Sequence, residues 1–179
     1  MFLVSVLVVS LITNSCTDSG NKPGKGVITK NNIVQQNDDG TIDLHIEKAS
    51  CYNDNINPSC NTAEWNIIVS KPGRYKVWLS SATKDTMDLQ YTSTVKISFQ
   101  DERLDVLPVG DKIVLNTKDV KYPYYRADSY MGTFYIQEPG EYIIQVISEK
   151  AVAKSDNTQS KPVTDHTKIM SVFLTPMTR

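Results

Sequence analysis

The feature that most constrains the fold of this chain is a repeated alternation of apolar and polar residues in short runs. Gly, Pro, Asn and Asp separate the runs, and no window of 12 or more residues keeps a helical period of 3.6. The predicted strands are residues 27–34, 41–47, 63–70, 74–81, 94–100, 103–107, 111–115, 131–137, 141–148 and 168–175. The pattern therefore predicts an all-β chain of about nine or ten strands.

One face of each predicted strand is apolar and has to be covered by another layer. The 179-residue chain is 40% hydrophobic, which is enough for one domain with a real core. The expected architecture is a two-sheet antiparallel β-sandwich. The residues expected to face its core include Ile42, Leu44, Ile46, Trp65, Ile67, Val69, Tyr75, Val77, Leu79, Val95, Ile97 and Phe99.

Two similar stretches, VSKPGRYKVW (69–78) and IQEPGEYIIQ (136–145), each place Pro-Gly between two predicted strands. Pro fixes φ near −65° and Gly permits positive φ, so each stretch is predicted to form a β-hairpin corner. Tyr75 and Tyr142 should begin the inward face of the returning strand. The similarity ends with these stretches, so they indicate matching corners of one sandwich rather than a duplicated unit.

The N-terminus carries an export pattern. Residues 2–12 are apolar apart from two serines, and they are too few to span a bilayer, which takes about 20. They match the apolar core of a secretory signal, and the following TNSC, with Ser15 before Cys16, resembles the lipobox of bacterial lipoproteins. Thr13 departs from the leucine that this family prefers. The alternative is a soluble exported protein with Cys16 as an ordinary thiol.

The resemblance to lipoproteins implies three parts: a signal peptide (1–15), a lipidated Cys16 with a flexible tether (16–26), and a sandwich domain (27–179). The tether consists of small and polar residues and contains Gly and Pro, so it would be flexible and hold the domain away from the membrane. A lipid chain would anchor the protein without spanning the bilayer. The expected location is the outer membrane, on its periplasmic side or at the cell surface.

Two further cysteines flank the segment CYNDNINPSC. Disulfides persist in exported proteins, and a Cys51–Cys60 bridge across this loop would contribute about 2–3 kcal/mol. The alternative is a pair of free thiols. Metal or redox use is less favoured because the spacing is not C-x-x-C and only His45 and His166 could add imidazole ligands.

Charge and motifs exclude several functions. Lys and Arg number 19 against 20 Asp and Glu and lie scattered, so nothing favours binding to nucleic acid. The sequence carries no phosphate-binding Gly loop, zinc motif or G-x-S-x-G, and Asp165-His166 alone makes no triad; we therefore expect no enzyme activity. We expect no cofactor. A structural calcium at residues 53–57 or at Asp38-Asp39 is the weaker alternative to surface turns.

Several motifs in order resemble a galactose-binding-like β-jelly roll, the fold of many carbohydrate-binding modules. These are WNIIV (65–69) followed by PGRYKVWL (72–79), VKISFQDERLDVL (95–107), GTFYIQEPGEYIIQVI (132–147) and IMSVFLTP (169–176). The resemblance covers roughly residues 40–176. It implies a jelly roll that binds sugars in loops or on a sheet face, in many members with a structural calcium. Other members serve as structural or interaction domains.

Aromatic residues outside the core phase are the candidates for a ligand site. Trp78 is out of phase with Val77 and Leu79, and the segment KYPYYRADSY (121–130) is the densest aromatic stretch. Pro123 and Asp128 predict that this segment is a loop. Aromatic faces pack on the C–H faces of sugars, and charged side chains bind their hydroxyls. The predicted sugar-binding residues are Trp78, Tyr122, Tyr124, Tyr125, Arg126, Asp128 and Tyr130.

Each candidate has a structural alternative: a loop or tail covers Trp78, and the tyrosines cap the end of the sandwich. The predicted function is a non-catalytic carbohydrate-binding lipoprotein of the bacterial envelope that takes an oligo- or polysaccharide. The alternative is a structural or protein-interaction domain of an envelope complex, with an envelope protein as its partner.

Overall fold

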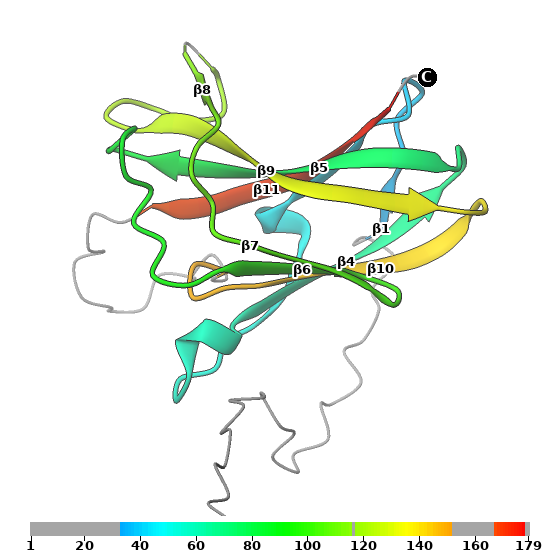
Figure 1. The fold of residues 1–179 in the computed structure, drawn as a ribbon, viewed down its shortest axis with the longest axis horizontal. Coiled ribbons are helices and arrows are strands. Elements are labelled where there is room, and N and C mark those ends of the chain that lie inside the picture. Colours follow the sequence, from blue (N-terminus) through cyan, green and yellow to red (C-terminus); the bar gives the residue numbers. More distant parts are fainter. Residues whose placement is uncertain (1–32, 116, 152–166, 178–179) are drawn as a thin grey trace, which may run out of the picture.

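The computed structural model describes residues 33–115, 117–151 and 167–177. Within these residues, eleven strands form two sheets that pack face to face, with two short 3₁₀ helices, η2 (Ile46–Lys48) and η3 (Pro58–Cys60). Figure 1 shows the two layers, with β5, β9 and β11 in one and β4, β6, β7 and β10 in the other. The predicted all-β sandwich is confirmed. Among the described residues, no helix is both long enough and apolar enough to cross a membrane.

The six-stranded sheet has the order β1-β4-β10-β6-β7, and β3 pairs with the first part of β4. Its strands are β1 (Ile33–Gln35), β3 (Ser50–Tyr52), β4 (Thr62–Val69), β6 (Val95–Phe99), β7 (Glu102–Val106) and β10 (Gly140–Ile147). The β1–β4 pair is parallel, and the other pairs are antiparallel.

The five-stranded sheet has the order β2-β11-β5-β9-β8, and all its pairs are antiparallel. Its strands are β2 (Ile42–His45), β5 (Gly73–Thr83), β8 (Lys112–Val114), β9 (Tyr125–Ile136) and β11 (Lys168–Pro176). The strand β8 and its flanking loops rise above the outer face of this sheet at one end of the sandwich (Figure 1).

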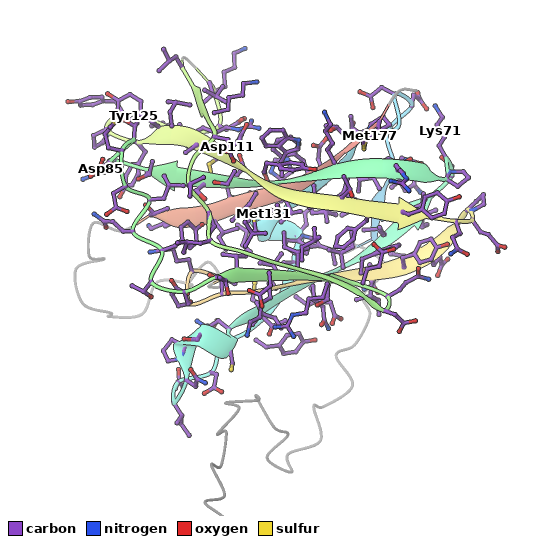
Figure 2. The ribbon with its side chains drawn as sticks, viewed as in Figure 1. Lys71, Asp85, Asp111, Tyr125, Met131 and Met177 are labelled. Carbon is purple, nitrogen blue, oxygen red and sulfur yellow. The ribbon has the colours of Figure 1, made fainter. Side chains whose placement is uncertain are left out.

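The core follows the predicted alternation. Trp65 is 1% exposed, and its indole N–H donates to the His45 carbonyl at 2.9 Å, so its one polar group is satisfied inside the protein. The other large side chains buried in the core include Ile42, Leu44, Ile67, Tyr75, Leu79, Ile97, Phe99, Met131, Phe134, Ile136 and Ile144. Figure 2 shows Met131 between the two layers.

The two Pro-Gly corners are not hairpins, and that prediction is wrong. The first corner joins β4 to β5 and the second joins β9 to β10, so each connects one sheet to the other. The reason is that both edges of β4 are already occupied, by β10 on one side and by β1 and β3 on the other. The crossings lie side by side, because Gly140 pairs with Val69 and Gly73 pairs with Ile136.

In both corners the tyrosine has the same role. The Tyr75 hydroxyl donates to the Lys71 carbonyl, and the Tyr142 hydroxyl donates to the Glu138 carbonyl at 2.7 Å. In each case the acceptor is the residue before the proline. Tyr75 is buried and Tyr142 packs partly against the core, as predicted.

Three local features differ from the predictions. Strand β3 was not expected, and Tyr125–Tyr130, expected to be a loop, is the first half of β9. The Cys51–Cys60 disulfide is also not formed, because Cys51 is a free thiol on β3 that packs against the core, where burial raises its pKa. The predicted strand at 27–34 lies mostly outside the described residues. The predicted signal peptide and Cys16 lie entirely outside them.

A β-bulge in the β5–β9 pair determines which side chains of β9 face outward. Val77 pairs with Gly132 but Trp78 pairs with Tyr130, so Met131 is the extra residue. Gly132 has φ +132°, and a Cβ on it would lie 2.8 Å from a Leu104 methyl carbon on β7. The bulge lets Met131 enter the core while Tyr130 stays beside Trp78 on the outer face.

Candidate functional site

The candidate site is the outer face of the five-stranded sheet, where β9, β5 and β11 place their outward side chains in three rows. The rows are Tyr130, Trp78 and Phe173; then Asp128, Ser80 and Ser171; then Arg126, Ala82 and Lys168. Residues of adjacent rows are two positions apart along β5 and β9, so the first and third rows lie about 13 Å apart. The site therefore has an aromatic row at one end and a charged row at the other.

The aromatic row is held by ring contacts across three strands. The Trp78 and Tyr130 rings have centroids 5.3 Å apart with planes at 59°, and the Trp78 and Phe173 rings are 6.2 Å apart and nearly parallel, at 7°. Tyr130 is 41% exposed, whereas Trp78 and Phe173 are partly exposed. The row leaves aromatic surface open to solvent on the outside of the sandwich. We refer to these three residues as the aromatic row.

Arg126 connects the charged row to the aromatic row. Its guanidinium lies over the Phe173 ring, 5.4 Å from the centroid, in a cation–π arrangement. Two carboxylates hold it there: Nη1 donates to Asp119 at 2.7 Å, and Nε and Nη2 donate to the two oxygens of Asp128 at 2.8 and 3.2 Å. Arg126 is therefore positioned before any ligand arrives.

Burial on its own would lower the pKa of Arg126, but hydrogen bonds to Asp128 and Asp119, together with their charges, raise it above its usual value. The pKa of Asp119 is lowered, first by a hydrogen bond from the Thr117 hydroxyl and then by Arg126. The guanidinium and this carboxylate are therefore both charged at neutral pH. The outer face presents a fixed ion pair beside the rings.

Asp128, which was predicted to bind sugar, is enclosed by neighbours in its own sheet. Its residue is 3% exposed, and besides Arg126 its carboxylate accepts a hydrogen bond from the Ser80 hydroxyl at 2.5 Å. A carboxylate enclosed in this way holds the Arg126 guanidinium in place. Asp128 tolerates a strand position because its charge is satisfied by neighbours in its own sheet.

The tyrosines of the 122–125 segment line two hollows beyond the charged row. The first, of about 340 Å³, is lined by Ala82, Val120, Lys121, Tyr122, Tyr124 and Lys168. The second, of about 260 Å³, is lined by Val114, Thr117, Val120, Tyr122, Tyr124 and Tyr125. Tyr122 is 90% exposed, and the Lys84 ammonium lies 5.3 Å from the centre of the Tyr124 ring. Figure 2 shows Tyr125 beside β8, at the end of the sandwich opposite Lys71.

The structure places the seven predicted residues on the five-stranded sheet or beside it, in two groups. Trp78, Tyr130, Arg126 and Asp128 share the strand face, whereas Tyr122, Tyr124 and Tyr125 line the hollows. Ala82 joins the groups, because it pairs with Arg126 and lines the first hollow.

Sequence reasoning missed Phe173, although the signal was available. Phe173 lies between Val172 and Leu174, both fully buried, and on β11 it directly faces Trp78. Like Trp78, Phe173 is therefore an aromatic residue whose two neighbours along the strand are buried in the core.

A second concave region was also missed. A trough of about 630 Å³ crosses the outer face of the six-stranded sheet, lined by Ile33, Asn66, Ile67, Ile68, Ser98, Gln100, Glu141, Tyr142, Ile143 and Gln145. The available signal was two Ile-Ile pairs, 67–68 and 143–144, in which one member enters the core and the other faces the trough.

The acidic turns considered for calcium are occupied by local hydrogen bonds. Asp39 Oδ1 accepts from the N–H and the hydroxyl of Thr41, and Asp54 Oδ1 accepts from the N–H groups of Ile56 and Asn57. Within the described ranges, no group of three or more His, Cys, Asp or Glu side chains is placed to hold a metal ion.

Comparisons with known proteins give the fold and little more. No protein-family model and no curated protein matches the sequence. The structure is similar to part of an alpha-L-fucosidase from Vibrio sp. strain EJY3, with a TM-score of 0.63 and 21% identity over 82% of this chain and 24% of that one. At this identity the match shows the fold alone. This chain spans about a quarter of the fucosidase's length.

Two further solved structures are more distant. They are a Podospora anserina GH26-CBM35 beta-(1,4)-mannanase (TM-score 0.47, 12% identity, 79% of this chain and 28% of that one) and the insecticidal crystal protein Cry2Aa (TM-score 0.48, 9% identity, 80% and 22%). Both TM-scores are too low to support an argument. The two-sheet sandwich therefore rests on the structure itself and on the fucosidase match.

Proposed function

We propose that this protein is a non-catalytic carbohydrate-binding domain of the bacterial envelope, and that the aromatic row with Arg126 is its sugar-binding surface. The observation that carries the proposal is the row itself: three aromatic side chains from three strands meet on an outer face, with a fixed guanidinium beside them. Sugars offer C–H faces to aromatic rings and hydroxyls to charged groups. The similarity to part of a fucosidase is consistent with such a role.

The two carboxylates that hold Arg126 are arranged for binding rather than for catalysis. Asp128 is enclosed by Arg126 and Ser80, and Asp119 is ion-paired with Arg126, so both carboxylates serve to fix the guanidinium. Glycoside hydrolysis needs two carboxyl groups that flank the scissile bond and act on it. Here the same groups are committed to a neighbouring side chain.

The test is affinity electrophoresis of the purified full-length protein through gels that contain neutral and acidic polysaccharides. Trp78→Ala and Tyr130→Ala should each weaken retardation about tenfold or more, because each removes a ring from the surface. Tyr52→Ala is the matched control, since Tyr52 is a similarly exposed tyrosine, 44% against 41%, on the other sheet. A folded wild-type protein that no polysaccharide retards would overturn the proposal.

We further propose that the domain is attached to the outer membrane through a lipid on Cys16, which follows the predicted signal peptide. The support is the apolar leader that precedes TNSC. The test is the mass of the N-terminal peptide from a membrane fraction. A peptide that starts at Cys16 and carries acyl chains is expected, and Cys16→Ser should release the protein from the membrane. An unmodified Cys16 would contradict the proposal.

The trough on the six-stranded sheet favours a second candidate function, the docking of an envelope protein. Ile143 is 49% exposed in the trough, and Asn66, Gln100 and Gln145 add amide groups. Co-purification of a stoichiometric partner that Ile143→Asp abolishes would support this function. Retention of the same partner by the variant would contradict it.

A further inference from the structure

We propose that the sugar bound at this site is acidic, and that its carboxylate or sulfate group lies between Lys121 and Lys168 in the hollow at the end of the charged row. The inference rests on the proposed sugar-binding function and specifies the class of glycan. The described residues that line this hollow are two lysines, two tyrosines, a valine and an alanine, with no carboxylate among them.

The two lysines come from separate segments that the fold brings together. Lys168 begins β11 and pairs with Ala82 on β5, whereas Lys121 lies in the loop between β8 and β9. Both are exposed, and within the described part of the chain neither takes part in an ion pair. Two lysines that line one hollow favour an anion in it.

The tyrosine rings of the hollow would contact the apolar face of the sugar, as the lysines would bind its charge. Tyr122 and Tyr124 both line it, and Tyr122 is 90% exposed. A sugar with an anionic substituent combines an apolar C–H face, which suits a tyrosine ring, with a charge that suits an ammonium group. A free inorganic anion would use the lysines but not the rings.

The size of the hollow limits its occupant. At about 340 Å³ it is near the lower end of the range of small-molecule sites, about 300–1,000 Å³. It therefore suits one or two sugar units, and a longer chain would continue across Arg126 toward the aromatic row. The two ends of the site then have separate roles: the rings of the sheet bind sugar faces, and the lysines select the charge.

The test compares retardation of the full-length protein in gels of a neutral glucan, a polyuronate, a sulfated galactan and poly-glutamate. The wild type should bind one of the two acidic polysaccharides about tenfold or more tightly than the neutral glucan. Lys121→Gln with Lys168→Gln should remove this preference, so that the acidic polysaccharides retard the variant no more than the neutral glucan does. Lys96→Gln, on the other sheet, is the matched control and should change nothing.

The outcomes separate the two proposals. The polyuronate and the sulfated galactan distinguish a carboxylate from a sulfate as the bound group. Equal binding of neutral and acidic polysaccharides overturns the acidic-sugar proposal and leaves the sugar-binding function standing. Equal binding of poly-glutamate and the acidic polysaccharides also overturns it, because rings would then contribute nothing. Absence of binding to any polysaccharide overturns both.

Discussion

At the scale of single residues, Asp128 illustrates how a charged side chain can belong to a sheet. The residue is 3% exposed, yet its carboxylate receives hydrogen bonds from Ser80 and from two nitrogens of Arg126. An aspartate usually indicates a turn when it is read in isolation, and Asp128 together with Pro123 therefore predicted a loop. The partners that reverse this preference lie on β5 and two residues away on β9.

Replacing Asp128 should destabilise the protein and loosen Arg126. Asp128→Asn keeps the shape but removes the negative charge, so Arg126 stays partly buried with only Asp119 as its ionic partner. We expect a loss of about 2–3 kcal/mol in the free energy of unfolding, measured by urea denaturation.

The control for this prediction is an exposed ion pair. Arg103 and Asp105 lie 3.3 Å apart with side chains 52% and 44% exposed, so Asp105→Asn should change stability by less than about 0.5 kcal/mol. If the two variants lose the same amount, the enclosed carboxylate contributes no more than a surface ion pair, and its assigned positioning role is wrong.

At the scale of elements, the predictions succeeded wherever the local pattern contains the answer. The alternation along β4 (Thr62–Val69), β5 (Gly73–Thr83) and β10 (Gly140–Ile147) follows from which side chains are apolar. The core residues predicted from this alternation are buried as expected. The sheet to which each strand belongs could not be predicted in this way, because it depends on pairing between strands that are distant in the sequence. The Pro-Gly corners therefore looked like hairpins although they cross between sheets.

The corners lead to a prediction about their tyrosines. Tyr75 is 1% exposed, and its hydroxyl donates to the Lys71 carbonyl and accepts from the Gln36 amide at 2.7 Å. The Tyr142 hydroxyl makes the single bond to Glu138 at a partly exposed position. We expect Tyr75→Phe to cost about 1–3 kcal/mol and Tyr142→Phe about 0.5–1 kcal/mol in urea denaturation.

Tyr135→Phe is the control for the two corner variants, because Tyr135 is 49% exposed on β9, and its hydroxyl should contribute little to stability. An order in which Tyr142→Phe costs more than Tyr75→Phe would contradict the view that buried bonds at the first corner hold the crossing in place.

At the scale of the whole molecule, the candidate site depends on the pairing register of β5 with β9 and with β11. The sequence places Trp78 on an outer face, but it does not say that Phe173 and Tyr130 lie on either side of it. That arrangement depends on a bulge at Met131 and on a second irregularity between Ile169 and Ser171. Bulges shift every later residue on a strand, so local periodicity cannot predict which outer residues meet.

Four carboxylates in separate loops link the stability of the whole molecule to pH. Their pKa values are lowered from the usual 3.8 for Asp and 4.5 for Glu, and they are Asp39, Asp54, Asp119 and Glu149. The largest causes are the Thr41 hydroxyl for Asp39, the Asn57 N–H for Asp54 and the Thr117 hydroxyl for Asp119. For Glu149, burial raises the pKa, and hydrogen bonds from Ser93 and Thr92 outweigh it.

A carboxylate whose pKa is lower in the folded state stabilises the fold when it is ionised. Its contribution is complete above the pKa of the unfolded chain and is lost as the pH falls through the folded value. We therefore expect the urea midpoint to vary little on account of these four groups between pH 7 and about pH 5 and to fall progressively below about pH 4.5. The combined variant Asp39→Asn, Asp54→Asn, Asp119→Asn and Glu149→Gln should be less stable at pH 7 and should lose less on acidification. A midpoint that rises as the pH falls from 5 to 3, or a variant with an unchanged acid slope, would show that these turns do not link stability to pH.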